Sequence, residues 1–244
     1  DGPFRAIDAS QGMLAWEAAS AATECDPAVL GNLIAVATTA RELLVLRADG
    51  GRQGSVPLPQ AVQAGVLPMA GSDVFVACAD GMGLRIDCKN LKVRWRTSIP
   101  KGVIATPVLL PEGIALASDS GRVALLNPES GAQLWSTSVD GEVTCPPCRI
   151  GTSLFVTCSR ELVRLDLATG RKTDAVSSPS RWTSGAASVG GKLVLGTEQG
   201  KCLVLDPRTL APLYQLQGSG RVRVTPLVLP GDLLLILSEN RTVQ

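Results

Sequence analysis

Two cysteines separated by two prolines come closer to a chemical motif than any other residues of this sequence. They stand as Cys145-Pro-Pro-Cys148, and two thiols at this spacing are typical of redox centres and metal sites. Against that chemistry, Pro147 falls on a recurring position of the chain, and the motif opens a predicted strand rather than a helix. The sequence also has no histidine and no second cysteine pair at ligand spacing. We therefore interpret the pair as structural.

Repeated aspartates offer a second candidate chemistry, which is calcium binding. Asp87, Asp166 and Asp206 each follow a β-rich run and precede turn-forming residues. An aspartate in that place hydrogen-bonds its own backbone and starts a turn. We interpret the three as turn residues and predict no catalytic residue, no cofactor and no metal site, although Asp, Glu, Lys and Tyr remain available for acid–base chemistry.

The elements that position these residues belong to a repeat of about 40 residues, a period typical of propellers and solenoids. The residue that ends one strand of each repeat recurs every 39 or 40 positions, at Asp8, Arg47, Asp87, Asn127, Asp166 and Asp206. Four residues later the chain has Gly12, Gly51, Gly131 and Gly170, with Leu91 and Leu210 as exceptions. Eight residues after the first position come Trp16, Trp95, Trp135 and Tyr214, with Ser55 and Asp174 as exceptions. About twenty residues after it come Pro27, Pro68, Pro107, Pro147 and Pro226.

Each recurring residue has a physical role in a four-stranded unit. Glycine supplies the positive φ of a tight hairpin, and we expect the aromatic residue to pack one unit against the next. In the best-formed unit the predicted strands are 107–110, 114–118, 122–126 and 132–136. Four short strands in about 40 residues predict an all-β fold, a β-propeller of four-stranded blades with about six repeats in a single domain over residues 1–244.

The two ends of the sequence suggest two ways in which the blades of the predicted propeller form a ring. Residues 4–17 supply the last two strands of a blade and residues 222–239 the first two, so together they would make one composite blade of six. Alternatively, because residues 240–244 look like the start of another third strand, the sequence is a segment of a longer chain. It would then be an arc of a seven- or eight-bladed ring, and its unclosed blade edges would invite association.

Composition narrows the classes of partner. The net charge is +1, from 23 basic and 22 acidic residues, which gives no support for nucleic acid as a partner. Apolar runs are of strand length, so we predict no transmembrane segment. The seven cysteines are odd in number and scattered, which is not a disulfide framework. Free thiols suit a reducing compartment, although an exported protein could carry them too.

The repeat resembles that of the PQQ-like (pyrroloquinoline-quinone-like) propeller family, in which Asp leads to Thr-Gly, then Trp, then Val and Pro. The resemblance rests on Leu165-Asp-Leu-Ala-Thr-Gly170, Asn127-Pro-Glu-Ser-Gly-Ala-Gln-Leu-Trp135 and Gly102-Val-Ile-Ala-Thr-Pro107. WD40 units have a similar period, but their Trp-Asp and Gly-His signatures are missing. The family includes quinone- and calcium-dependent dehydrogenases, whose adjacent cysteine pair is absent here. It also includes non-enzymatic relatives, such as bacterial outer-membrane assembly lipoproteins and the sensor regions of kinases, and these imply a partner-binding platform and a bacterial cell envelope or periplasm.

A binding site on such a fold is expected on the loops that precede each first strand. These loops contain Gln63, Lys101, Glu142, Arg181, Trp182, Arg221 and Arg223. Trp182 lies off the tryptophan positions of the repeat, so we expect that the fold does not require it. Beside Arg181 it is a candidate hot spot, because Trp and Arg dominate such sites; the alternative is that it plugs a blade interface weakened by Asp174. Our candidate partner-binding rim is Lys101, Arg181, Trp182, Arg221 and Arg223.

These observations favour a non-catalytic interaction or scaffold module that binds protein partners. The alternatives are part of a PQQ- and calcium-dependent quinoprotein dehydrogenase and a ligand-sensing propeller of a larger signalling protein. On the first hypothesis, replacing Trp182 with alanine would weaken partner binding and leave the melting temperature nearly unchanged.

Overall fold

The structure is a computed structural model that describes residues 4–18, 22–218, 220–222, 224–231, 233–237 and 239. These residues form 24 β-strands and no helix. No helix capable of crossing a membrane occurs among them. The chain divides into two compact units, Asp1–Leu109 with Pro128–Ala132, and Leu110–Asn127 with Gln133–Gln244.

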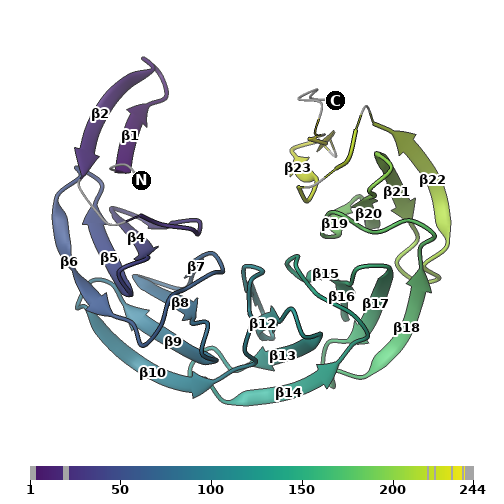
Figure 1. The fold of residues 1–244 in the computed structure, drawn as a ribbon, viewed down its shortest axis with the longest axis horizontal. Helices are drawn as coiled ribbons and strands as arrows, with labels where there is room; N and C mark the ends of the chain where they lie inside the picture. The colour runs from purple at the N-terminus through teal and green to yellow at the C-terminus, as the bar shows by residue number, and fades with distance from the viewer. Residues whose placement is uncertain are drawn as a thin grey trace. The chain divides into compact units, whose positions relative to one another are not determined.

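The first unit contains a two-stranded sheet followed by two four-stranded sheets (Figure 1). The two-stranded sheet is β1 (Phe4–Asp8) and β2 (Met13–Ala18). The next is β3 (Ala28–Leu30), β4 (Leu33–Thr38), β5 (Glu42–Arg47) and β6 (Arg52–Pro57). The third is β7 (Leu67–Pro68), β8 (Asp73–Ala77), β9 (Met82–Asp87) and β10 (Lys92–Ser98).

The remaining sheets repeat the same order. One is β11 (Val108–Leu110), β12 (Gly113–Ala117), β13 (Arg122–Leu126) and β14 (Gln133–Ser138). The second unit contains two more complete sheets. One is β15 (Cys148–Ile150), β16 (Ser153–Thr157), β17 (Glu161–Asp166) and β18 (Lys172–Ser177). The other is β19 (Ala187–Val189), β20 (Lys192–Gly196), β21 (Lys201–Leu205) and β22 (Pro212–Gln217). The last pair is β23 (Leu227–Leu229) and β24 (Leu233–Leu235). Each complete sheet joins its strands in chain order, so the predicted four-stranded blade is confirmed.

The hairpin between the third and fourth strands has the same irregularity throughout the described sheets. A register shift occurs next to the turn in all six of these hairpins, for example between Leu125 and Leu126 in β13. A bulge of this kind accompanies a turn that ends in a left-handed residue. The turn chemistry therefore sets the register of the outermost strand.

The turn aspartates act as the sequence predicted. Asp166 Oδ1 accepts hydrogen bonds from Thr169 N at 2.9 Å and Thr169 Oγ1 at 2.6 Å. Asp206 Oδ1 accepts from Arg208 N at 2.7 Å and Thr209 N at 3.2 Å. These bonds favour the ionised carboxylates and lower the pKa of both aspartates from the ordinary value of 3.8.

The predicted turn glycines need one correction. In the second repeat the left-handed residue is Gly50, with φ +83°, and the prediction of Gly51 is wrong by one position. Leu91 and Leu210, the exceptions to the glycine pattern, take the same left-handed conformation with φ of 54° and 56°. The backbone geometry of the turn is therefore retained at these two positions despite the strain of a side chain there.

Tryptophans from the fourth strands form the contacts between consecutive repeats. Trp135 covers the turn of the following sheet so closely that a Cβ on Gly170 would lie 2.5 Å from the indole ring. Its Nε1 donates to Leu167 O at 2.8 Å. Trp95 Nε1 donates in the same way to Pro128 O at 3.1 Å, and Trp16 Nε1 to Ala48 O at 2.8 Å. All three acceptors are the residue after the strand-ending position, so the predicted packing role is confirmed for these three tryptophans. Tyr214, the fourth aromatic residue of the column, is 53% exposed.

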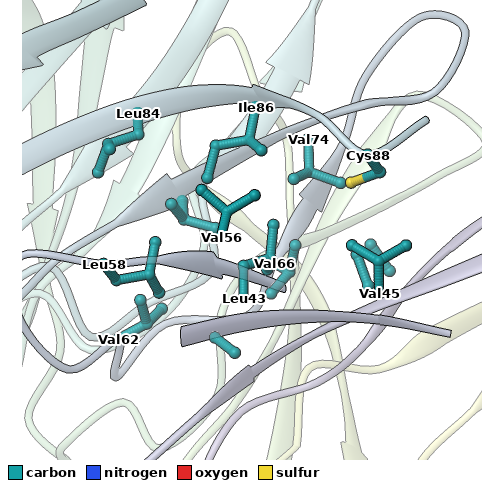
Figure 2. Close-up of a cluster of buried hydrophobic side chains, with 14 of the residues drawn as sticks. Leu43, Val45, Val56, Leu58, Val62, Val66, Val74, Leu84, Ile86 and Cys88 are labelled. Carbon is teal, nitrogen blue, oxygen red and sulfur yellow. The ribbon is translucent and has the colours of Figure 1, made fainter. Parts of the chain in front are cut away.

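Apolar side chains of the central strands fill the space between sheets. Figure 2 shows such a cluster in the first unit, where Leu43 and Val45 of β5 lie near Val74 of β8 and Ile86 of β9. All four are fully buried. Because the inner strands are covered on both faces, their sequences are continuous apolar runs. They lack the alternation of apolar and polar residues that is typical of strands with one face in solvent.

Replacing Gly170 with alanine should destabilise the protein more than the same change at Gly151. Both positions have positive φ, +71° and +57°, so each substitution costs about 1–2 kcal/mol of backbone strain. Only at Gly170 does the new Cβ meet the Trp135 ring, and overpacking adds about 1–3 kcal/mol. Equilibrium urea unfolding measures both variants, and equal losses would contradict the role given to the tryptophan contact.

Acid should weaken the turns that Asp166 and Asp206 cap. A lowered pKa means that their stabilising contribution is present above the ordinary value of 3.8 and is lost as the pH falls through the lower folded-state value. The double variant Asp166→Asn with Asp206→Asn keeps the acceptor oxygens but does not titrate. Its urea midpoint should fall less steeply than that of the parent protein below pH 3.8, and parallel curves would contradict this account.

Candidate functional site

A polar hollow of about 240 Å³ lies in the second unit, at loops that precede the first strands β15, β19 and β23 and at the turn between β20 and β21. Its walls are Thr144, Arg181, Trp182, Thr183, Glu198 and Arg221. The structure thus brings together three members of the predicted rim, Arg181, Trp182 and Arg221.

Backbone hydrogen bonds fix the loop that carries Arg181 and Trp182. Glu198 N donates to Arg181 O at 3.0 Å, and Trp182 N donates to Ser159 O at 3.0 Å. Thr183 Oγ1 donates to Val222 O at 2.6 Å. The loop is therefore tied to the sheets on both sides, and the floor of the hollow is formed in advance of any ligand.

Ion pairs line the hollow. Arg181 Nη2 lies 3.4 Å from Glu142 Oε2, and Arg221 Nη2 lies 2.9 Å from Glu198 Oε1. Between one third and one half of each of these side chains is exposed. Exposed pairs of this kind contribute only about 0–1 kcal/mol, so they can exchange for a partner's charges at little cost.

Trp182 is buried, with 5% of its surface exposed. It packs in a core cluster with Phe155, Leu193 and Leu205 among others. An isolated β-bridge pairs it with Thr197, just as bridges pair Val62 with Cys78 and Val143 with Cys158.

This bridge position is a further recurring position of the repeat. Its members are Val62, Val103, Val143, Trp182 and Val222, all buried and spaced 39 to 41 residues apart. The expectation that the fold does not require residue 182 is therefore wrong, because a side chain at this position always enters the core. The sequence contains the evidence for this burial, because residue 182 has the same spacing as the buried valines. The change from valine to tryptophan made the match hard to see. Burial supports the interpretation of Trp182 as a plug between sheets, while its role in binding stays untested.

The other predicted rim residues lie elsewhere or are not described. Lys101 and Gln63 are exposed in the first unit and are not among the walls of the hollow. Glu142 takes part as the ion-pair partner of Arg181. Arg223 lies outside the residues that the structure describes.

The cysteine motif has the properties of partly buried thiols of low reactivity. Cys145 and Cys148 are free and half-buried, and Cys148 opens strand β15 as predicted. Burial raises the pKa of both thiols, that of Cys148 to about 11, so the reactive thiolate is disfavoured. Within the described residues no group of three or more Cys, Asp or Glu side chains is placed to hold a metal ion.

Comparison with known proteins places the repeat in a family. The model of a PQQ-type repeat family described as outer membrane protein assembly factor BamB matches residues 1–145 and 95–209. This chain belongs to the BamB family. The PQQ-like resemblance predicted from the sequence is thus confirmed.

Two individual BamB proteins show the extent of the similarity. The outer membrane protein assembly factor BamB of Burkholderia pseudomallei (strain K96243) is 30% identical over 153 residues, which are 59% of this chain and 40% of that protein. The crystal structure of BamB from Moraxella catarrhalis superposes with a TM-score of 0.86 at 15% identity, covering 99% of this chain and 78% of the other. The structural match confirms the β-propeller fold, and the chain spans less than half of the Burkholderia relative.

Replacing Trp182 with alanine should now lower stability strongly, contrary to the sequence-based expectation of an unchanged melting temperature. Truncating a buried tryptophan costs about 3–5 kcal/mol, and each kcal/mol lowers Tm by about 2–4 °C in a domain of this size. Tyr214→Ala is the control, because Tyr214 is 53% exposed. Calorimetry that gave the same small shift for both variants would contradict the structural role of Trp182.

Proposed function

We propose that this chain is a non-catalytic interaction module that binds a protein partner in the bacterial cell envelope and serves the assembly of outer-membrane proteins. The observation that carries the proposal is the hollow at Arg181 and Arg221, formed in advance by hydrogen-bonded loops in a chain of the BamB family. The dehydrogenase and ligand-sensing alternatives remain predictions that no observation here favours.

The electrostatics of the hollow fit a partner segment that carries both acidic and polar groups. Arg181 and Arg221 each present a planar guanidinium suited to bidentate recognition of carboxylates. Their present partners, Glu142 and Glu198, are exposed and held weakly. An acidic side chain of a partner would displace a glutamate from an arginine, and the freed glutamate would remain solvated. Recognition therefore needs little rearrangement of the backbone.

Site-specific photo-crosslinking in the source cell tests this function. A photo-reactive residue at Thr144, a wall of the hollow, should yield one discrete crosslinked product with an envelope protein. The same residue at Gln215, which is exposed in β22 away from the hollow, should yield none. Equal products from both positions, or none from Thr144, would count against a partner site at this hollow.

Reversing the charges of the two arginines should weaken binding without unfolding the protein. In the double variant Arg181→Glu with Arg221→Glu, the guanidinium groups that recognise carboxylates are replaced by repelling charges. We expect partner affinity to fall at least about tenfold, mostly through slower association. Surface plasmon resonance with the crosslinked partner measures the rates. Arg5→Glu is the control because its ion pair with Glu17 lies on β1 and β2. Unchanged association in the double variant would refute the role of the arginines.

A further inference from the structure

A second, apolar hollow lies on the other side of Trp182. It has a volume of about 170 Å³ and lies between the sheet β15–β18 and the sheet β19–β22. Val176 of β18, Leu203 and Leu205 of β21, and the turn residue Leu210 form its walls together with Trp182. Its walls also include the exposed residues Ser177 and Pro212, so the hollow reaches the protein surface.

The hollow lies at a contact between sheets that departs from the repeat, as the contact of Ser55 and Leu91 in the first unit also does. Where the preceding sheet has Trp135 over Gly170, this contact has Asp174 on the fourth strand and Leu210 in the turn. Leu210 replaces the glycine that elsewhere lies beneath an indole ring. No tryptophan from the fourth strand is available to fill the space beside it.

An arginine bonds the turn carbonyl at this contact, as Arg85 Nη1 also bonds Pro128 O, at 2.8 Å, beside Trp95. Arg164 Nη1 donates to Pro207 O at 3.0 Å, and Pro207 is the counterpart of the carbonyl residues that Trp95 and Trp135 bond. Asp174 holds the guanidinium from the other side, at 3.3 Å from Arg164 Nη2. The hydrogen bond of the repeat is thus preserved, while the apolar volume of the ring is not replaced.

Size and lining define what the hollow can accept. An apolar cavity of about 150 Å³ lined by aliphatic and aromatic side chains binds benzene in a protein interior, and this hollow is slightly larger. The indole Nε1 of Trp182 is buried and has no hydrogen-bond partner among the described residues.

We propose that this hollow is a binding site for a single compact aromatic ring, of phenyl to indole size. The ring takes the volume that the fourth-strand tryptophan fills at the preceding contact. Its source is either a free aromatic molecule or an aromatic side chain of another protein, since both present the same chemistry. The site is separate from the polar hollow, so its occupancy does not depend on the proposed function.

Titration of the isotope-labelled protein with two probes tests the proposal. The ¹H–¹⁵N signal of the Trp182 indole N–H, assigned with Trp182→Phe, is followed during addition of indole and, separately, of N-acetyl-tryptophanamide. A saturable shift of this signal with indole alone identifies a site for free molecules. A saturable shift with both probes identifies a site that also admits a side chain carrying its backbone. The absence of saturation with either probe overturns the proposal.

Filling variants locate the site. Val176→Phe places a ring inside the hollow and should weaken indole binding at least about tenfold. Leu203→Phe fills the hollow from the opposite wall. It replaces Val176→Phe in this test if that variant does not fold. Gln133→Phe adds the same bulk at an exposed position of β14, outside the hollow, and should bind indole like the parent. Undiminished indole binding in a folded filling variant would equally overturn the proposal.

Discussion

The packing of an indole ring over the turn of the next sheet is the contact on which the rest of the structure depends. A four-stranded sheet of this kind has two apolar faces and cannot bury both by itself. Trp16, Trp95 and Trp135 close the outer part of their contacts, while the apolar cores close the inner part. Because the ring leaves no room for a Cβ, the turn beneath it requires glycine as much for space as for its φ angle.

The fold was predictable from the sequence because its signals are local and repeated. A strand-ending aspartate and a turn glycine each shape the backbone within a few residues, and a tryptophan follows at a fixed distance from them. The same spacing recurs in six repeats, which strengthens the prediction. Gly50 was misplaced because two adjacent glycines satisfy the same pattern and only the backbone distinguishes them. Leu91 and Leu210 were taken as exceptions because sequence rules do not show that a turn can hold a left-handed leucine.

The candidate site was less accessible to sequence reasoning. Proximity of Arg181 and Arg221 follows from their equivalent places in consecutive repeats, which the sequence contains. The burial of Trp182 was predicted only as one of two alternatives, because a tryptophan was compared with the other tryptophans and not with the valines of its own column. The ion pairs to Glu142 and Glu198 depend on side-chain geometry, which a pattern of residue types does not contain.

The presence of Asp174 in place of a fourth-strand tryptophan also has a consequence for folding cooperativity. In a linear array of similar units, stability is a sum of unit terms and nearest-neighbour coupling terms. At this contact polar bonds of Arg164 occupy the outer part, and the coupling rests on the apolar cluster around the buried ring of Trp182. Trp182 therefore carries this coupling, and where its packing loosens, local opening divides the second unit between the sheets β15–β18 and β19–β22. The contact that Trp135 closes is not involved in such an opening.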